Sequence, residues 1–85
     1  MENRIGFKAY VEVVAVFTPD GTLRPLYLVW EDGRRYDIDK IKSVCREANR
    51  RAGGCGICYT CRIMGRDIKL YYEENYRWFV EAKGD

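Results

Sequence analysis

The sequence predicts a single small all-β domain, an antiparallel meander or SH3-like barrel of six or seven strands. Three observations predict this fold class. Seven Tyr, three Phe and two Trp among 85 residues favour strands over helices. Apolar residues recur at every second position in several runs, and turn residues such as Pro, Gly, Asp and Asn separate those runs. A chain this short makes one domain, which we expect to span residues 1–85 with short polar tails at about 1–6 and 82–85.

The first three expected strands form two hairpins. Apolar residues alternate over 7–17, which predicts a strand. A turn follows at 18–22, because Pro presets its own φ, Asp can bond the backbone ahead and Gly accepts a positive φ. The return strand is expected over 23–31. Asp32-Gly33 then leads into a strand over 34–38, since Asp-Gly between two strand-like runs is a strong hairpin signal.

The last three expected strands cover 57–64, 68–73 and 76–81. Residues 65–67, Gly-Arg-Asp, predict a tight turn between the first two of these strands. Glu74-Asn75 separates the second from the third, which carries Trp78, Phe79 and Val80.

Residues 39–52 fit two structures. Apolar residues at helical spacing, with Asp39 as a possible N-cap and Gly53 as a possible C′ residue, predict an α+β alternative with one helix at about 39–52. The same stretch could form a strand to about Ala48 that pairs with 57–63 across a Gly-rich turn. The apolar residues at helical spacing are Ile41, Val44, Cys45, Ala48 and Ala52.

Several motifs resemble those of one family. They are Trp30-Glu31-Asp32-Gly33-Arg34, Ile38-Asp39-Lys40, Ala52-Gly53-Gly54, Gly56-Ile57, Tyr59-Thr60-Cys61-Arg62-Ile63 and Arg77-Trp78-Phe79-Val80-Glu81. Over roughly residues 8–82 the chain resembles small uncharacterised β-rich proteins of clostridia and related bacteria. The resemblance implies a small all-β module that tolerates helix-breaking residues in the region matching 41–48, which favours the strand. That family has no assigned function, and it commonly has Arg where this chain has Cys58.

Four cysteines are the candidate metal ligands, namely Cys45, Cys55, Cys58 and Cys61. Structural zinc takes four such ligands in a tetrahedron, so a zinc or redox domain is one hypothesis. Extended geometry argues against it, because Cys58 and Cys61 would point to opposite faces of a strand. The chain has no His, the commonest partner of Cys in zinc sites. We therefore expect no cofactor, with these thiols as small apolar residues.

Positive charge is concentrated in residues 40–69, which contain eight basic residues and only two acidic ones, Glu47 and Asp67. The rest of the chain has seven basic and eleven acidic residues. Cations beside aromatic rings are typical of surfaces that bind single-stranded nucleic acid. A solvated polar face is the alternative. The candidate nucleic-acid-binding residues are Lys42, Arg46, Arg50, Arg51, Tyr59, Arg62, Arg66 and Lys69.

These patterns favour a non-enzymatic binding module. The chain lacks His as a general base and any nucleophile placed beside one, and so small a barrel leaves little room for a catalytic cleft. The partner is expected to be nucleic acid, or alternatively another protein. A cytoplasmic location is expected, with no membrane contact, because no run of 18 apolar residues and no N-terminal apolar segment is present.

Overall fold

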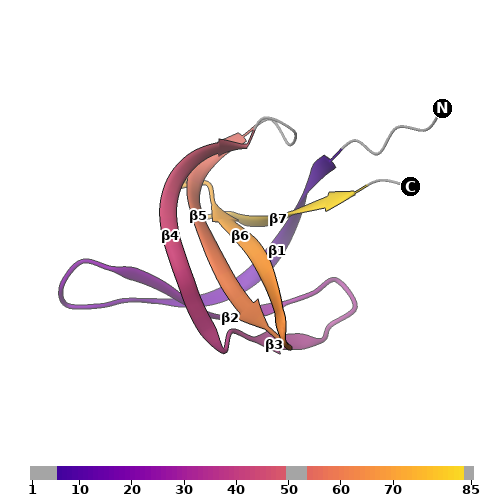
Figure 1. Ribbon diagram of the computed structural model, residues 1–85, viewed down its shortest axis with the longest axis horizontal. Coiled ribbons are helices and arrows are strands. Elements are labelled where there is room, and N and C mark those ends of the chain that lie inside the picture. The colour runs from indigo at the N-terminus through magenta and orange to yellow at the C-terminus, as the bar shows by residue number, and fades with distance from the viewer. Residues whose placement is uncertain (1–5, 50–53, 84–85) are drawn as a thin grey trace.

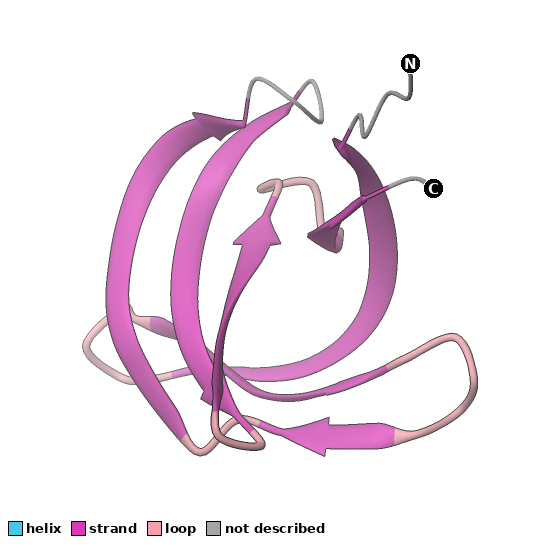
Figure 2. Cartoon of the chain, turned by 45° about the vertical axis from the view of Figure 1, so that its right-hand side comes forward, coloured by secondary structure: helices cyan, strands magenta, loops and turns pink. Residues whose placement is uncertain are grey.

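The computed structural model describes residues 6–49 and 54–83, with side chains over 8–46 and 56–81. These residues form seven antiparallel strands and no helix, as Figure 2 shows, so the all-β prediction is confirmed and the helix at 39–52 is wrong for its described part. The strands are β1 (Gly6–Phe17), β2 (Leu23–Val29), β3 (Arg35–Asp37), β4 (Lys40–Asn49), β5 (Gly54–Ile63), β6 (Arg66–Tyr72) and β7 (Trp78–Lys83).

The strands make one curled, half-barrel sheet in the order β3-β2-β1-β7-β6-β5-β4 (Figure 1). Strand β1 pairs with two different strands along its length. Its first half, from Gly6 to Val11, pairs with β7, and its second half, from Glu12 to Phe17, pairs with β2. The two end strands β3 and β4 follow one another in the chain, and Asp39 N donates to the Arg62 carbonyl at 2.9 Å where the chain crosses between them.

The main core lies on one face of this sheet. Tyr59, Leu70 and Val80 lie side by side on β5, β6 and β7, and Leu28 of β2 packs against the same cluster. Leu70 is fully buried. The Tyr59 hydroxyl donates to the Leu23 carbonyl at 2.7 Å, so β5 is bonded to β2, which is not its neighbour in the sheet.

A second, smaller cluster lies on the opposite face. Cys58, Tyr71 and Phe79 stand in one lateral row across β5, β6 and β7, and none is more than 3% exposed. The Tyr71 and Phe79 rings stack with centroids 4.9 Å apart, and Tyr10 of β1 meets Phe79 edge-on at 5.9 Å. Strands β5 to β7 are thus buried on both faces where this row crosses them.

The structure moves several expected boundaries. The turn placed at 65–67 consists of Met64 and Gly65, both with positive φ (50° and 77°), and Arg66 already belongs to β6. The last strand starts at Trp78, not at Tyr76. It also runs to Lys83, because Ala82 and Lys83 pair with β1, so the expected tail at 82–85 begins too early.

Candidate functional site

Five basic residues of β4, β5 and β6 lie near one end of the sheet. We name this group the cationic end and define it as Lys40, Lys42, Arg62, Arg66 and Lys69. Register places Lys40 opposite Arg62, and Arg62 opposite Asp67. Lys69 is two residues beyond Asp67 on β6 and therefore shares its face of the sheet. Lys42 and Arg62 thus contact Asp67, and register places Lys40 and Lys69 on the same face. Arg66 precedes Asp67 in β6 and lies on the other face of the sheet.

Asp67 organises this group. Its carboxylate accepts from Lys42 Nζ at 2.8 Å and from Arg62 Nε at 2.9 Å, one bond on each oxygen. These bonds, Lys42 first, hold the pKa of Asp67 below its ordinary value, so Asp67 stays charged in mild acid. All three side chains are 38–45% exposed, so the pairs add little stability. They hold the Lys42 and Arg62 side chains beside Asp67 at the surface.

The other predicted nucleic-acid-binding residues divide into three groups. Arg46 lies apart from the cationic end and makes a two-pronged pair with Glu74, at 2.6 and 3.0 Å. Arg50 and Arg51 lie outside the described residues. Tyr59 is 3% exposed and belongs to the core, so in this structure its ring is not accessible to a nucleotide base.

The described thiols do not form one ligand set. Cys58 and Cys61 lie in the clusters on opposite faces of the sheet, as extended geometry predicts. Cys45, which is exposed, is the register partner of Cys58 on β4. No group of three or more Cys, Asp or Glu in the described part of the chain is placed to hold a metal ion, and the Cys55 side chain lies outside that part.

The environment of Cys61 also opposes thiolate chemistry. Cys61 is fully buried, and this burial raises its thiol pKa from 9.0 to about 11. A metal ligand or redox nucleophile must be a thiolate, which such a group does not supply near neutral pH.

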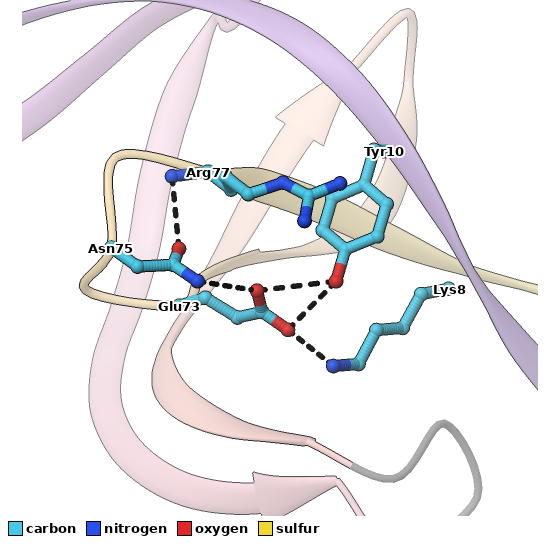
Figure 3. Close-up of polar contacts among 5 residues, drawn as sticks. All are labelled: Lys8, Tyr10, Glu73, Asn75 and Arg77. Carbon is cyan, nitrogen blue, oxygen red and sulfur yellow. Dashed lines mark hydrogen bonds and ion pairs between the residues drawn. The ribbon is translucent and has the colours of Figure 1, made fainter.

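A partly shielded ionic network, drawn in Figure 3, lies on the same face as the smaller cluster, because Tyr10 pairs in register with Phe79. The Glu73 carboxylate pairs with Lys8 and accepts from the Tyr10 hydroxyl at 3.0 and 3.1 Å and from Asn75 Nδ2 at 3.2 Å. The Arg77 guanidinium lies 3.7 Å from the centre of the Tyr10 ring. Lys8 and Tyr10 share one face of the strand expected over 7–17, but Glu73 is the last residue of the strand expected over 68–73, and no pattern in the sequence links the two segments.

The network changes the pKa values of its two ion-paired groups, Glu73 and Lys8. The hydrogen bond from Lys8, with smaller contributions from Tyr10 and Asn75, holds the pKa of Glu73 below its ordinary 4.5 despite partial desolvation. The same bond raises the pKa of Lys8. The Glu73 side chain is 9% exposed and that of Lys8 19%, so this pair is shielded from solvent far more than the pairs of the cationic end.

Glu73→Gln is expected to make folding less sensitive to acid. A carboxyl group with a lowered pKa in the fold stabilises it above its unfolded pKa, and this stabilisation is lost as pH falls through the folded value. Urea midpoints of wild type and Glu73→Gln should therefore differ at pH 7 and converge as the pH falls below 4.5 and through the lowered folded-state pKa. Glu74→Gln is the matched control, because the Glu74 carboxylate is 41% exposed and its pair with Arg46 is solvated. An equal pH response of all three proteins contradicts the assignment.

No protein-family model, curated protein or solved structure matches this chain. Within the described residues, no helix has the length and apolar character needed to cross a membrane.

Proposed function

We propose that this domain is a non-enzymatic module that binds single-stranded nucleic acid through the cationic end. The observation that carries the proposal is the gathering of Lys40, Lys42, Arg62 and Lys69 around one carboxylate, Asp67, at the ends of three neighbouring strands. Phosphates spaced along a flexible strand can follow such a group, and release of their counterions drives binding.

A neighbouring hollow extends this surface. Lys40 and Arg24 both line it, together with Ile41, and its volume is about 230 Å³. Arg24 comes from β2, so a strand of nucleic acid that crosses the cationic end would meet a further cation on the other side of the hollow. With Tyr59 in the core, the contacts are with phosphates, and binding should discriminate little between sequences.

The proposal is tested by titrating a fluorescent oligothymidylate with the protein at several salt concentrations. Neutralisation of four or five phosphates predicts a slope of about −3 for the logarithm of the association constant against that of salt. The double variant Arg66→Glu/Lys69→Glu removes two cations and should reduce that slope by about 1.4 and weaken binding at low salt.

The matched control is Arg34→Glu/Arg35→Glu, which changes net charge equally at the turn before β3 and at its start. It should leave more binding intact than the variant at the cationic end. Equal loss in both variants would mean that overall charge, not this surface, drives binding. Absence of binding by wild type at low salt would overturn the proposed function.

The hypothesis of a zinc or redox domain has less support, because the cysteines lie on different faces of the sheet and one of them is held as a neutral thiol. Cys58 and Cys61 contribute to different faces of β5, and burial raises the pKa of the Cys61 thiol. A protein-interaction role has separate support on another surface, described next.

A further inference from the structure

The second half of β1 has an open edge. Its first half pairs with β7 as far as Val11, opposite Trp78, and no described strand continues along that side of residues 12–17. Thr18 N donates to the Thr22 carbonyl, so Thr18 and Thr22 form a hydrogen-bonded pair. In an antiparallel ladder every second residue of a strand bonds to the partner strand, so Thr18 sets which residues of β1 bond to β2. By that alternation Ala15 and Phe17 direct their backbone groups away from β2, in agreement with the partner of Ala15 being Pro25, which has no N–H.

Two adjoining hollows lie along this edge. One, of about 180 Å³, is lined on the β1 side by Val13, Ala15 and Phe17. The other, of about 320 Å³, lies beside residues 10–13. Tyr76 and Trp78 line both hollows, opposite β1. The open edge of β1 therefore borders a groove whose other wall includes Tyr76, in the turn before β7, and Trp78, the first residue of β7.

Two aromatic side chains at this groove are turned toward solvent. Phe17 is 76% exposed and Tyr76 is 91% exposed. The Tyr76 backbone has φ = +69°, a left-handed conformation that a bulky aromatic residue rarely adopts. The turn imposes it, since Glu73 N donates to the Arg77 carbonyl and Arg77 N to Asn75 Oδ1, a bond drawn in Figure 3. Glycine would fit this backbone without strain, so the presence of Tyr at position 76 suggests that its side chain has a function.

The open edges of the sheet differ in protection. The outer side of β4 presents exposed Lys42 and Arg46, and its register shifts between Ile41 and Ser43. Charged residues and bulges of this kind discourage strand addition. Residues 13–17 of β1 are Val-Val-Ala-Val-Phe, with no charge. Of these two described edges, that of β1 is the better suited to receive a strand.

We propose that an extended peptide segment of another protein adds to the 13–17 edge of β1. Its backbone would bond to Ala15 and Phe17, and a large apolar side chain would fill the smaller hollow. Two charged residues line the larger hollow, Glu12 on β1 and Arg77, whose guanidinium lies over the Tyr10 ring. A basic residue of the peptide is therefore expected only where it lies beside Glu12, which is exposed.

The probe is the capped peptide Ser-Val-Thr-Phe-Thr-Lys-Lys-Ser, with its reversed sequence to cover both strand directions. We expect amide NMR shifts at residues 12–17 and 76–78, saturating at micromolar to millimolar peptide. A peptide with alternate backbone nitrogens methylated keeps the side chains but removes hydrogen-bond donors, and it should bind at least ten-fold more weakly. Equal binding of the methylated peptide would overturn strand addition.

Three variants sharpen the test. Phe17→Lys should weaken binding at least ten-fold without unfolding the domain, because the ring is mostly solvated. Tyr76→Gly should also weaken binding yet raise the urea midpoint, since glycine relieves the left-handed backbone. Met64→Lys, at a residue 74% exposed in another turn, is the control and should leave both readouts unchanged. No binding of either probe, shifts confined to β4, or dimerisation through residues 13–17 would each overturn the proposal.

Discussion

Phe79→Ala is expected to lower the free energy of unfolding by about 3–5 kcal/mol. Phe79 is fully buried, and its ring stacks on Tyr71 at a centroid distance of 4.9 Å with an interplanar angle of 5°. The Lys8 ammonium lies 5.1 Å from the centre of the same ring and pairs with Glu73. Truncation would remove apolar burial and a ring pair and would leave a cavity beneath this ion pair.

The change affects the middle of the sheet. Phe79 lies on β7, the fourth of seven strands in spatial order, and its neighbours Trp78 and Val80 face the main core. A domain of this size has a total stability of about 5–10 kcal/mol, so the variant should be close to unfolding at room temperature. Urea denaturation followed by Trp fluorescence measures the loss.

Two controls separate the ring from its surroundings. Phe79→Leu keeps most of the apolar volume and should cost about 1–2 kcal/mol. Tyr10→Phe keeps the edge contact with Phe79 but removes the hydroxyl bonded to Glu73, so it reports on the network alone. A loss below about 1 kcal/mol for Phe79→Ala would mean that the smaller cluster is not part of the cooperative core.

The strands were predictable from the sequence because alternation and turn chemistry act locally. Thr18–Thr22 turns as its residues suggest, with Gly21 at φ = +86° and Thr22 N bonded to Asp20 Oδ1. The turn at Met64-Gly65 was misplaced because Met64 is a non-glycine residue at positive φ, which residue type alone does not signal.

The strand at 40–49 required information from outside the segment. Its apolar spacing suits a helix, and as a strand it leaves Val44 53% exposed and Cys45 on the opposite face. The hydrogen-bonding edge of β5 decides the matter, because a helix there would leave the β5 backbone groups without the partners that β4 supplies. Pairing with β5 in the sheet therefore outweighs the helical spacing of the apolar residues within this segment.

The candidate sites depended on contacts between distant residues, and the sequence suggested only part of them. Basic composition located the cationic end, but the sharing of Asp67 by Lys42 and Arg62 follows from the register of three strands. The Lys8–Glu73 pair spans 65 positions in the chain. The open edge of β1 exists because this strand changes neighbours at its midpoint, and no local pattern marks that change.

Gly56→Ala is expected to destabilise the domain by about 3 kcal/mol or more. A Cβ atom at Gly56 would lie 2.1 Å from the Tyr72 carbonyl oxygen, 3.0 Å from its carbon and 3.2 Å from the Glu73 Cα. All three are backbone atoms, so no rotation of a side chain relieves the clash. The carbonyl belongs to the residue of β6 that pairs with both Ile57 and Trp78.

Relief of that clash must therefore disturb one of two structures. Movement of β5 breaks its pairing with β6, and movement of the chain at residues 72–73 displaces the Glu73 carboxylate from Lys8 and Tyr10. Gly21→Ala separates this steric effect from the ordinary cost of losing glycine, because Gly21 has φ = +86° and open space around its Cβ direction. It should cost about 1 kcal/mol. If the two variants unfold at similar urea concentrations, the close approach of β5 to Tyr72 does not constrain the fold. If Gly56→Ala is far less stable and its remaining folded population also loses the acid response of Glu73, the glycine is required both for the β5–β6 pairing and for the position of the buried carboxylate.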